Sequence, residues 1–348
     1  MRKVPLKYGI LILIILSSVI IISQISSQSP RVQGNQQFQK GMAFPTWRYD
    51  QYSSPGSDKS IKILKRKTCT EWVQLVPTWY QEDKFSNKMS PDSKGMTANK
   101  KSLRHAIRTA HKLGLKIMLK PHVDAFDGSW RGTFQPTDPE AWFKNYRKMM
   151  RNYARLAQKE NVEILSIGCE FIEVTKSEFT GQWSRIVRTV KKYYKGPLVY
   201  SANWWQEYIQ VEFWGELDYI GIDAYFTLTG KTDPTLEELL TSWKLYLTQI
   251  ETFYQGWKIP VILTEIGYRS IDGANIRPWD WETSGTVDLE EQALCYQAVI
   301  ETFKGKPWFK GIYWWNWEPD PSLGGPDDKG YTPHKKPAEK IVKKWYCE

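Results

Sequence analysis

Two glutamates of this sequence follow short apolar runs and are the residues best suited to do chemistry. Glu265 follows the run in "IPVILTEIGYRS", residues 259–270, and Glu170 follows the run in "SIGCEF", residues 166–171. A charged group beside an apolar core is costly unless it has partners or a chemical role. Two carboxyl groups can divide proton transfer and nucleophilic attack between them. They can cooperate only if the fold brings them to one place.

Strand-like and helix-like segments alternate after residue 40. The eight expected strands are short, nearly continuous apolar runs, as in strands covered on both faces: 41–44, 71–76, 116–120, 163–168, 198–201, 219–223, 260–264 and 311–315. The expected helices are 57–66, 99–113, 139–160, 176–194, a short one in 206–217, 235–254, 289–303 and 336–346. Helix boundaries are indicated at Asp138-Pro139, at Asp233-Pro234 and at Gly114. Successive βα units predict a (β/α)8 TIM barrel, one catalytic α/β domain over residues 40–348.

The carboxyl ends of the strands meet at the active-site face of such a barrel. Glu170 and Glu265 follow the fourth and seventh expected strands, so both lie on that face. Aromatic, amide, imidazole and charged side chains follow other strands. We expect these to bind substrate: Trp79, Lys120, His122, Asn203, Trp204, Asp223, Tyr225 and Trp315.

Glycoside hydrolysis requires two carboxyl groups, together with aromatic and hydrogen-bonding side chains that bind the sugar. One Glu protonates the leaving oxygen, and the other attacks the anomeric carbon or activates water. The chain holds 18 Trp and 19 Tyr, which supply flat faces for sugar rings. We expect Tyr225 to donate a hydrogen bond to Glu265, and Asp223 to accept hydrogen bonds rather than to catalyse.

Several motifs together resemble a known family. "GMAFPTW", "LKPHVD", "SIGCEF", "GIDAYF", "LTEIGYRS" and "GIYWWNWEPD" are similar to glycoside hydrolase family 113, retaining barrels of clan A whose known activity is endo-β-1,4-mannanase. The resemblance implies β-mannan or glucomannan as substrate, Glu265 as nucleophile and Glu170 as general acid and then base. The chain departs from the clan pattern at two points. Cys169 stands where most members have Asn, and the second strand lacks the Arg that many members place beside the nucleophile.

Other interpretations stay open at this point. A carbohydrate-binding barrel without catalysis would keep the Trp residues but would not need both Glu. A transglycosylase acting on cell-surface glycans would use the same nucleophile. His122 could be held by Asp124 in the core, or it could face the substrate. Metal binding by His122 and Asp124 is disfavoured because the sequence offers no third metal ligand. Cys169 has no His at a plausible partner position, which disfavours a nucleophilic role. We expect no cofactor and no metal.

The remaining sequence features concern partners and location. The net charge of +10 comes from Lys and Arg spread along helices, and without a nucleic-acid motif we expect no nucleic-acid partner. The four cysteines lack CxxC spacing, which disfavours zinc and leaves a single disulfide possible. Residues 1–28, basic and then apolar, predict a signal peptide or a membrane anchor, and residues 29–39 a flexible tether. We therefore expect a monomer that binds polysaccharide or oligosaccharide and is secreted or anchored to the outer face of the cell membrane.

Overall fold

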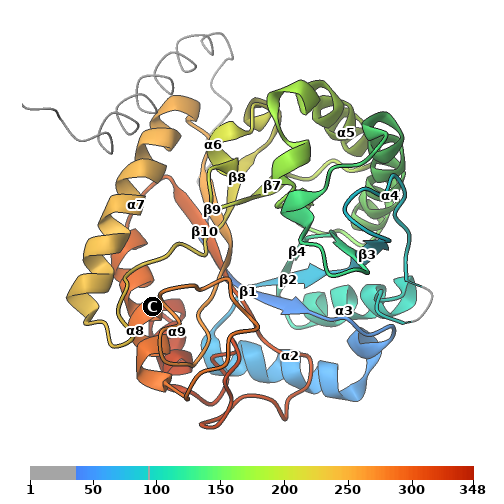
Figure 1. Ribbon diagram of the computed structural model, residues 1–348. Helices are drawn as coiled ribbons and strands as arrows, with labels where there is room; N and C mark the ends of the chain where they lie inside the picture. Colours follow the sequence, from blue (N-terminus) through green and yellow to red (C-terminus); the bar gives the residue numbers. More distant parts are fainter. Residues whose placement is uncertain (1–36, 93–94) are drawn as a thin grey trace, which may run out of the picture.

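A closed parallel barrel forms the centre of the molecule. The computed structural model describes residues 37–92 and 95–348, and its barrel strands neighbour one another in the order β1-β10-β9-β8-β7-β6-β4-β2 (Figure 1). The barrel strands are β1 (Gln39–Pro45), β2 (Trp72–Val76), β4 (Lys116–Leu119), β6 (Ile164–Cys169), β7 (Leu198–Asn203), β8 (Tyr219–Asp223), β9 (Val261–Ile266) and β10 (Phe309–Trp314). Each expected strand is present, so the predicted barrel is confirmed.

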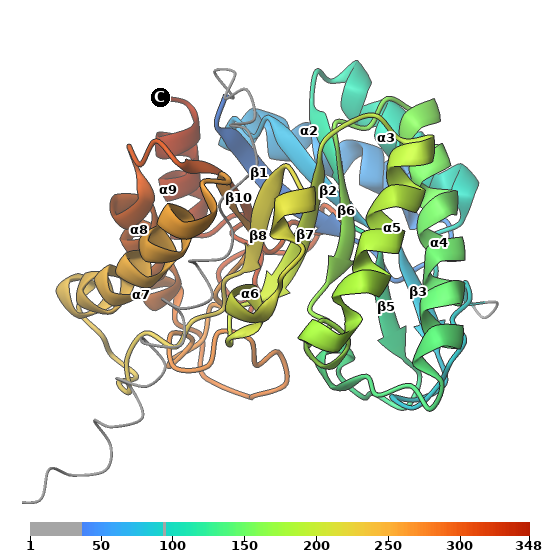
Figure 2. The ribbon, with the colours of Figure 1, turned by 90° about the horizontal axis from the view of Figure 1, so that it is seen from above.

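Helices cover the outside of the barrel, as the alternating pattern predicts (Figure 2). They are α2 (Pro55–Thr68), α3 (Lys100–Lys112), α4 (Pro139–Lys159), α5 (Thr180–Tyr193), α6 (Glu207–Gln210), α7 (Leu236–Trp257), α8 (Leu289–Phe303) and α9 (Pro337–Tyr346). Asp138 caps α4 through the amide of Ala141, as expected. The boundary expected at Asp233-Pro234 lies two residues too early, because Thr235 and Glu238 form a capping box that starts α7.

Two short strands were missed by the sequence reasoning. β3 (Thr78–Gln81) and β5 (His122–Ala125) pair in parallel and continue the direction of β2 and β4 beyond the barrel. Pro77 and Pro121 separate each from its barrel strand, and a proline cannot donate the ladder hydrogen bond. Because each proline interrupts the strand pattern, the sequence did not indicate β3 and β5. β5 carries His122 and Asp124 beyond the end of the barrel.

Residues 1–28 and most of the tether at 29–39 lie outside the described residues. Gln39, the last tether position, already belongs to β1. Among residues 37–92 and 95–348, no helix is long and apolar enough to span a membrane.

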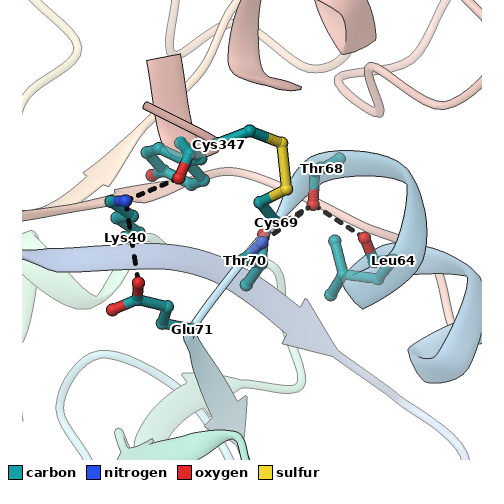
Figure 3. Close-up of a disulfide and its surroundings, with 8 residues drawn as sticks. Lys40, Leu64, Thr68, Cys69, Thr70, Glu71 and Cys347 are labelled. Carbon is teal, nitrogen blue, oxygen red and sulfur yellow. Dashed lines mark hydrogen bonds and ion pairs between the residues drawn. A yellow bond between two sulfur atoms is a disulfide. The ribbon is translucent and has the colours of Figure 1, made fainter. Parts of the chain in front are cut away.

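A disulfide joins two distant parts of the chain at the end of the barrel opposite the strand carboxyl ends. Cys69, directly after α2, is bonded to Cys347, directly after α9, and 278 positions separate them (Figure 3). Lys40 of β1 lies beside the bridge, where it pairs with Glu71 at 3.6 Å. The single bridge left open by the sequence is therefore present, while Cys169 and Cys295 are buried thiols.

Candidate active site

Glu265 lies near the carboxyl end of β9 and is 5% exposed. Lys120 Nζ donates to its Oε1 at 2.6 Å, and the Tyr225 hydroxyl donates to its Oε2 at 2.9 Å. The expected hydrogen bond from Tyr225 is confirmed. Burial raises the pKa of Glu265, and the Lys120 charge opposes that rise. Both oxygens of this carboxylate are thus bound by donors that favour its ionised form.

Lys120 lies behind Glu265 and is fully buried. Its Nζ contacts both oxygens of Asp223 at 2.9 Å, and Asp223 also accepts from the Thr264 hydroxyl at 2.7 Å. Burial lowers the pKa of Lys120, but the negative charges of Asp223 and Glu265 outweigh it and raise that pKa. We therefore assign Lys120 and Asp223 to holding Glu265 rather than to sugar contact. Asp223 accepts hydrogen bonds, as expected.

Trp315 lies at the same end of the barrel as Glu265, because the chain after β10 approaches the end of β9 closely. Its amide donates to the Ile266 carbonyl at 2.7 Å, and a Cβ added to Gly267 would lie 2.2 Å from the Trp315 carbonyl oxygen. Only glycine fits at that position. The Trp315 ring lies 6.2 Å from that of Trp47, which is 42% exposed, so an aromatic surface opens from the site to solvent.

His122 lies between Trp315 and Glu265. Its ring is nearly parallel to that of Trp315, at 7°, with ring centroids 6.5 Å apart, and its Nε2 is 3.6 Å from Glu265 Oε1. Burial, then the charges of Arg131 and Lys120, lower the pKa of His122 well below its usual value. Neither ring nitrogen has a hydrogen-bond partner among the described residues. A neutral imidazole with free nitrogens beside Glu265 suits a ligand hydroxyl, and Asp124 does not hold it.

Glu170 follows β6 directly and is 8% exposed. Its φ of +54° lies in the left-handed region, which is uncommon for a residue with a side chain. Its amide donates to the Ser201 carbonyl at 2.8 Å, and Asn203 Nδ2 donates to its Oε1 at 2.7 Å. Asn203 is therefore a hydrogen-bond partner of the Glu170 carboxyl group, and it lies on the rim, as expected.

Arg131 is a site residue that the sequence reasoning missed. It lies in the short 3-10 helix η2 (Arg131–Thr133), where no strand end points to it. Its guanidinium binds Asp124 Oδ1 at 2.6 Å and Cys169 Sγ at 3.2 Å, and lies 3.6 Å from Glu170 Oε2. Burial raises the pKa of Glu170, the Arg131 charge lowers it, and the Glu265 charge raises it, with a raised pKa as the result.

Glu207, the first residue of α6, is a second residue that was missed. It is fully buried and accepts hydrogen bonds from the Tyr200 hydroxyl at 2.6 Å, the Thr175 hydroxyl at 3.0 Å and the Asn203 amide at 2.6 Å. Burial raises the pKa of Glu207 to about 8, although these donors lower it. It follows Trp-Trp in a segment expected to be helical, and nothing in that pattern indicated a buried carboxyl group.

A group of Trp side chains lies in the segments that follow β7 and β9. The Trp204 ring stacks on Trp279, with centroids 5.1 Å apart, and its edge contacts Trp205 at 5.5 Å. Trp205 is 60% exposed and Trp279 is 41% exposed. The Trp205 amide donates to Asn203 Oδ1 at 2.8 Å, which ties this group to the partner of Glu170. Trp204 thus lies on the rim, and the other two Trp were not anticipated.

Trp79 does not belong to this rim surface. Its ring packs against Tyr153 of α4, with centroids 6.2 Å apart. Side chains alternate along a strand, so its neighbour Tyr80 takes the opposite side and stacks on Phe126. We assign Trp79 to packing under α4 rather than to sugar contact, because the unrecognised strand β3 determines which way it points.

Within the described residues, the groups of possible metal ligands are better explained by other contacts. The groups are His122, Cys169 and Glu265; Cys169, Glu170 and Asp223; and Asp272, Asp288 and Glu291. The buried cations Lys120 and Arg131 already bind members of the first two, and a divalent cation beside them would be repelled. In the third, Asp288 and Glu291 bind backbone amides. The first two groups therefore do not fit a metal.

Comparisons with known proteins identify the family of the chain. The family model for Glycoside Hydrolase Family 113 matches residues 43–336. A solved GH113 β-1,4-mannanase is 25% identical, with a TM-score of 0.81 over 90% of this chain and 99% of that one. A GH113 β-mannanase from Alicyclobacillus acidocaldarius is 26% identical, with a TM-score of 0.81 over 89% and 97%.

More distant matches show the fold alone. A β-glucuronidase from Ruminococcus gnavus is 13% identical, with a TM-score of 0.64 over 91% of this chain and 52% of that one. A search of curated protein sequences gave no match. The family model covers most of the chain and the two mannanases match it nearly end to end, so this protein is a glycoside hydrolase and belongs to glycoside hydrolase family 113.

Proposed function

We propose that the protein hydrolyses β-1,4-linked mannan or glucomannan with retention of configuration, by a double displacement that uses Glu265 and Glu170. The observation that supports this most is the set of contacts around Glu265, which is bound by a buried ammonium at 2.6 Å and a phenol at 2.9 Å. The β-mannanase titles of the two similar GH113 structures support the choice of substrate.

In the first step, Glu265 attacks the anomeric carbon while Glu170 gives its proton to the leaving oxygen. The bond to the leaving sugar breaks, and a glycosyl ester forms on Glu265. In the second step, Glu170 takes a proton from water, whose oxygen displaces Glu265 and restores the original configuration. The carboxyl groups are then expected to lie roughly 5 to 5.5 Å apart.

The surroundings of the two groups suit these roles. Burial raises the pKa of Tyr225 well above its usual value, and the Glu265 charge adds to that rise. Tyr225 therefore stays protonated and donates to the ionised nucleophile. Among residues 37–92 and 95–348, no cation lies within hydrogen-bond distance of Glu170, since Arg131 is 3.6 Å away, and the raised pKa of Glu170 favours the protonated acid.

The aromatic groups suggest a direction for the glycan. A general acid must lie on the side of the leaving group, and Asn203 joins Glu170 to the backbone of Trp205. The surface of Trp204, Trp205 and Trp279 is therefore expected to bind sugars on the leaving-group side. His122 lies beside Glu265, its ring faces Trp315, and Trp315 contacts Trp47; these three residues are expected to bind the sugar that forms the ester.

We also propose that the body acts outside the cytoplasm as a monomer, secreted or tethered through residues 1–39. The basic start and the apolar run support export. The Cys69–Cys347 bridge supports it independently, because structural disulfides persist in oxidising compartments. Fractionation of cells that express the full chain tests the location, and a soluble cytosolic protein would contradict it.

The substrate is tested by measuring reducing ends released from β-mannan, glucomannan, xylan, cellulose and chitosan. We expect release from mannan and glucomannan above the other polymers. A Glu170→Gln variant controls for contaminating enzymes and should be nearly inactive on polymer. Release from none of the five, with binding retained, would favour the carbohydrate-binding alternative. Products longer than an oligosaccharide substrate would favour the transglycosylase.

A further inference from the structure

Glu207 is a buried carboxyl group that the proposed mechanism does not use. It belongs to the connection between β7 and β8 and is fully buried. Burying a carboxyl group is costly unless donors compensate it. Tyr200, Thr175 and Asn203 supply three such donors, and they come from β7 and from the segment after Glu170. One group therefore holds several parts of the chain around Glu170 together.

Two of these hydrogen bonds lead to two different parts of the chain at Glu170. The Tyr200 hydroxyl, which donates to Glu207, accepts from the amide of Phe171 at 2.9 Å, and Phe171 directly follows Glu170. The backbone amide of Asn203 donates to Glu207, and the side-chain amide of Asn203 donates to Glu170 Oε1. Glu207 is thus linked to the backbone after Glu170 and to its carboxyl oxygen.

This double link matters because Glu170 has an uncommon backbone conformation. A φ of +54° on a residue with a side chain persists only where the surroundings hold it. The Glu170 amide bonds to the Ser201 carbonyl of β7, the strand that also carries Tyr200 and Asn203. Glu207 fixes the end of that strand relative to the segment after Glu170.

We infer that Glu207 is a positioning residue that holds Asn203 and Glu170 in the arrangement needed to protonate the leaving group. The inference rests on the proposed function, in which Glu170 is the general acid. Glu207 has no exposed surface with which to touch substrate. Its loss should impair steps that need a proton from Glu170 and spare those that do not.

Leaving-group dependence separates this role from a general structural one. Two aryl β-mannosides with the same sugar part are compared: a dinitrophenyl one, whose phenolate leaves without protonation, and a phenyl one, which needs the acid. The value of kcat/KM covers only the steps up to the glycosyl ester. In Glu207→Gln we expect a loss of about 10- to 100-fold on the phenyl substrate and of less than about 3-fold on the dinitrophenyl substrate.

Glu291→Gln is the matched control. Glu291 is a buried carboxyl group of α8 that likewise accepts backbone amides, from Gly273 and Asn275. Any loss in this variant should be equal on the two substrates. Equal losses in Glu207→Gln, or an unchanged value on the phenyl substrate, would overturn the inference. If Glu207→Gln does not fold, Tyr200→Phe must give the same selective loss, since it removes the link to Phe171.

A second readout does not depend on activity. In a crystal structure of Glu207→Gln, the distance of 2.7 Å between Asn203 Nδ2 and Glu170 Oε1 should lengthen beyond hydrogen bonding. An unchanged distance would overturn the positioning role even if the wild-type protein cleaved neither glycan nor aryl mannoside. Such an inactive wild type with the lengthened distance would instead refute the proposed function alone.

Discussion

The two glutamates of the site lie on the same end of the barrel, but they are held by different kinds of structure. Glu265 is bound by Lys120, which directly follows β4, and by Tyr225, which lies two residues after β8. Glu170 depends on Asn203 at the end of β7 and on groups from connecting segments. The barrel itself therefore fixes Glu265, whereas the connections adjust Glu170.

The two environments also differ in charge. Lys120 contacts Glu265 at 2.6 Å and is locked by Asp223, so a cation is permanently beside this carboxylate. Arg131 lies 3.6 Å from Glu170 and is drawn away by Asp124 at 2.6 Å. Groups whose surroundings treat ionisation differently can divide the roles of nucleophile and acid. The following variants test that division.

The largest effect is expected on the Glu265 side. Glu265→Gln keeps the shape but removes the nucleophile, so no ester can form. We expect kcat/KM on a dinitrophenyl β-mannoside to fall by on the order of 10⁴- to 10⁶-fold. Glu170→Gln should lose much less on this substrate, because its leaving group needs no proton. Similar losses in both variants would remove the distinction between the two groups.

Lys120→Met tests the fixed cation. It leaves Asp223 and Glu265 buried without their shared partner, which should lower the free energy of unfolding by about 3–5 kcal/mol in chemical denaturation. The Lys120 charge lowers the pKa of Glu265, so its loss should raise that pKa. A nucleophile must be ionised, and the acidic limb of kcat/KM against pH should therefore move to higher pH. An acidic limb that stays in place would show that Lys120 does not tune Glu265.

Arg131→Met tests the more distant cation, with a smaller effect. The pKa of Glu170 is raised, so general-acid activity is present below that pKa and is lost as pH rises through it. The Arg131 charge lowers this pKa, and its removal should move the alkaline limb to higher pH by about one unit or less. Arg185→Met, at an exposed Arg of α5 paired with Glu140, is the control and should leave the limb unchanged.

The disulfide should have the smallest effect on catalysis, since it lies at the opposite end of the barrel from both glutamates. Changing Cys69 and Cys347 together to Ser releases a link across 278 positions. We expect the free energy of unfolding to fall by roughly 2–5 kcal/mol and kcat/KM at low temperature to stay within about twofold. A large loss of activity in a protein that remains folded would mean that the bridge also shapes the site.

The sequence predicted the parts of the molecule that follow repeating patterns. The barrel strands and the rim position of Asn203, Trp204 and Tyr225 could be read from apolar runs and from the residues after them. The placement of Trp79 and the role of Lys120 could not, because the unrecognised strand β3 and the buried ion pairs depend on contacts between distant segments.

The residues around Glu170 show the same limit. Arg131 and Glu207 lie in short helical connections, where no periodic pattern marks a side chain that turns inward. Each also has a partner more than 30 positions away, Cys169 for Arg131 and Thr175 for Glu207. Single-sequence patterns contain no information on such pairings. On both sides of the site, residues directly after a strand could be predicted, whereas contacts made by connecting segments could not.

The most direct test of the account is the product that azide forms with each glutamate variant on an activated aryl β-mannoside. In Glu170→Ala the ester still forms on Glu265, and azide takes the place of the missing base, so the account predicts the β-glycosyl azide. In Glu265→Ala azide attacks the substrate directly in place of the nucleophile, so the account predicts the α-glycosyl azide. The same anomer from both variants, or full activity in either one, would contradict the assignment of Glu265 as nucleophile and Glu170 as acid and base.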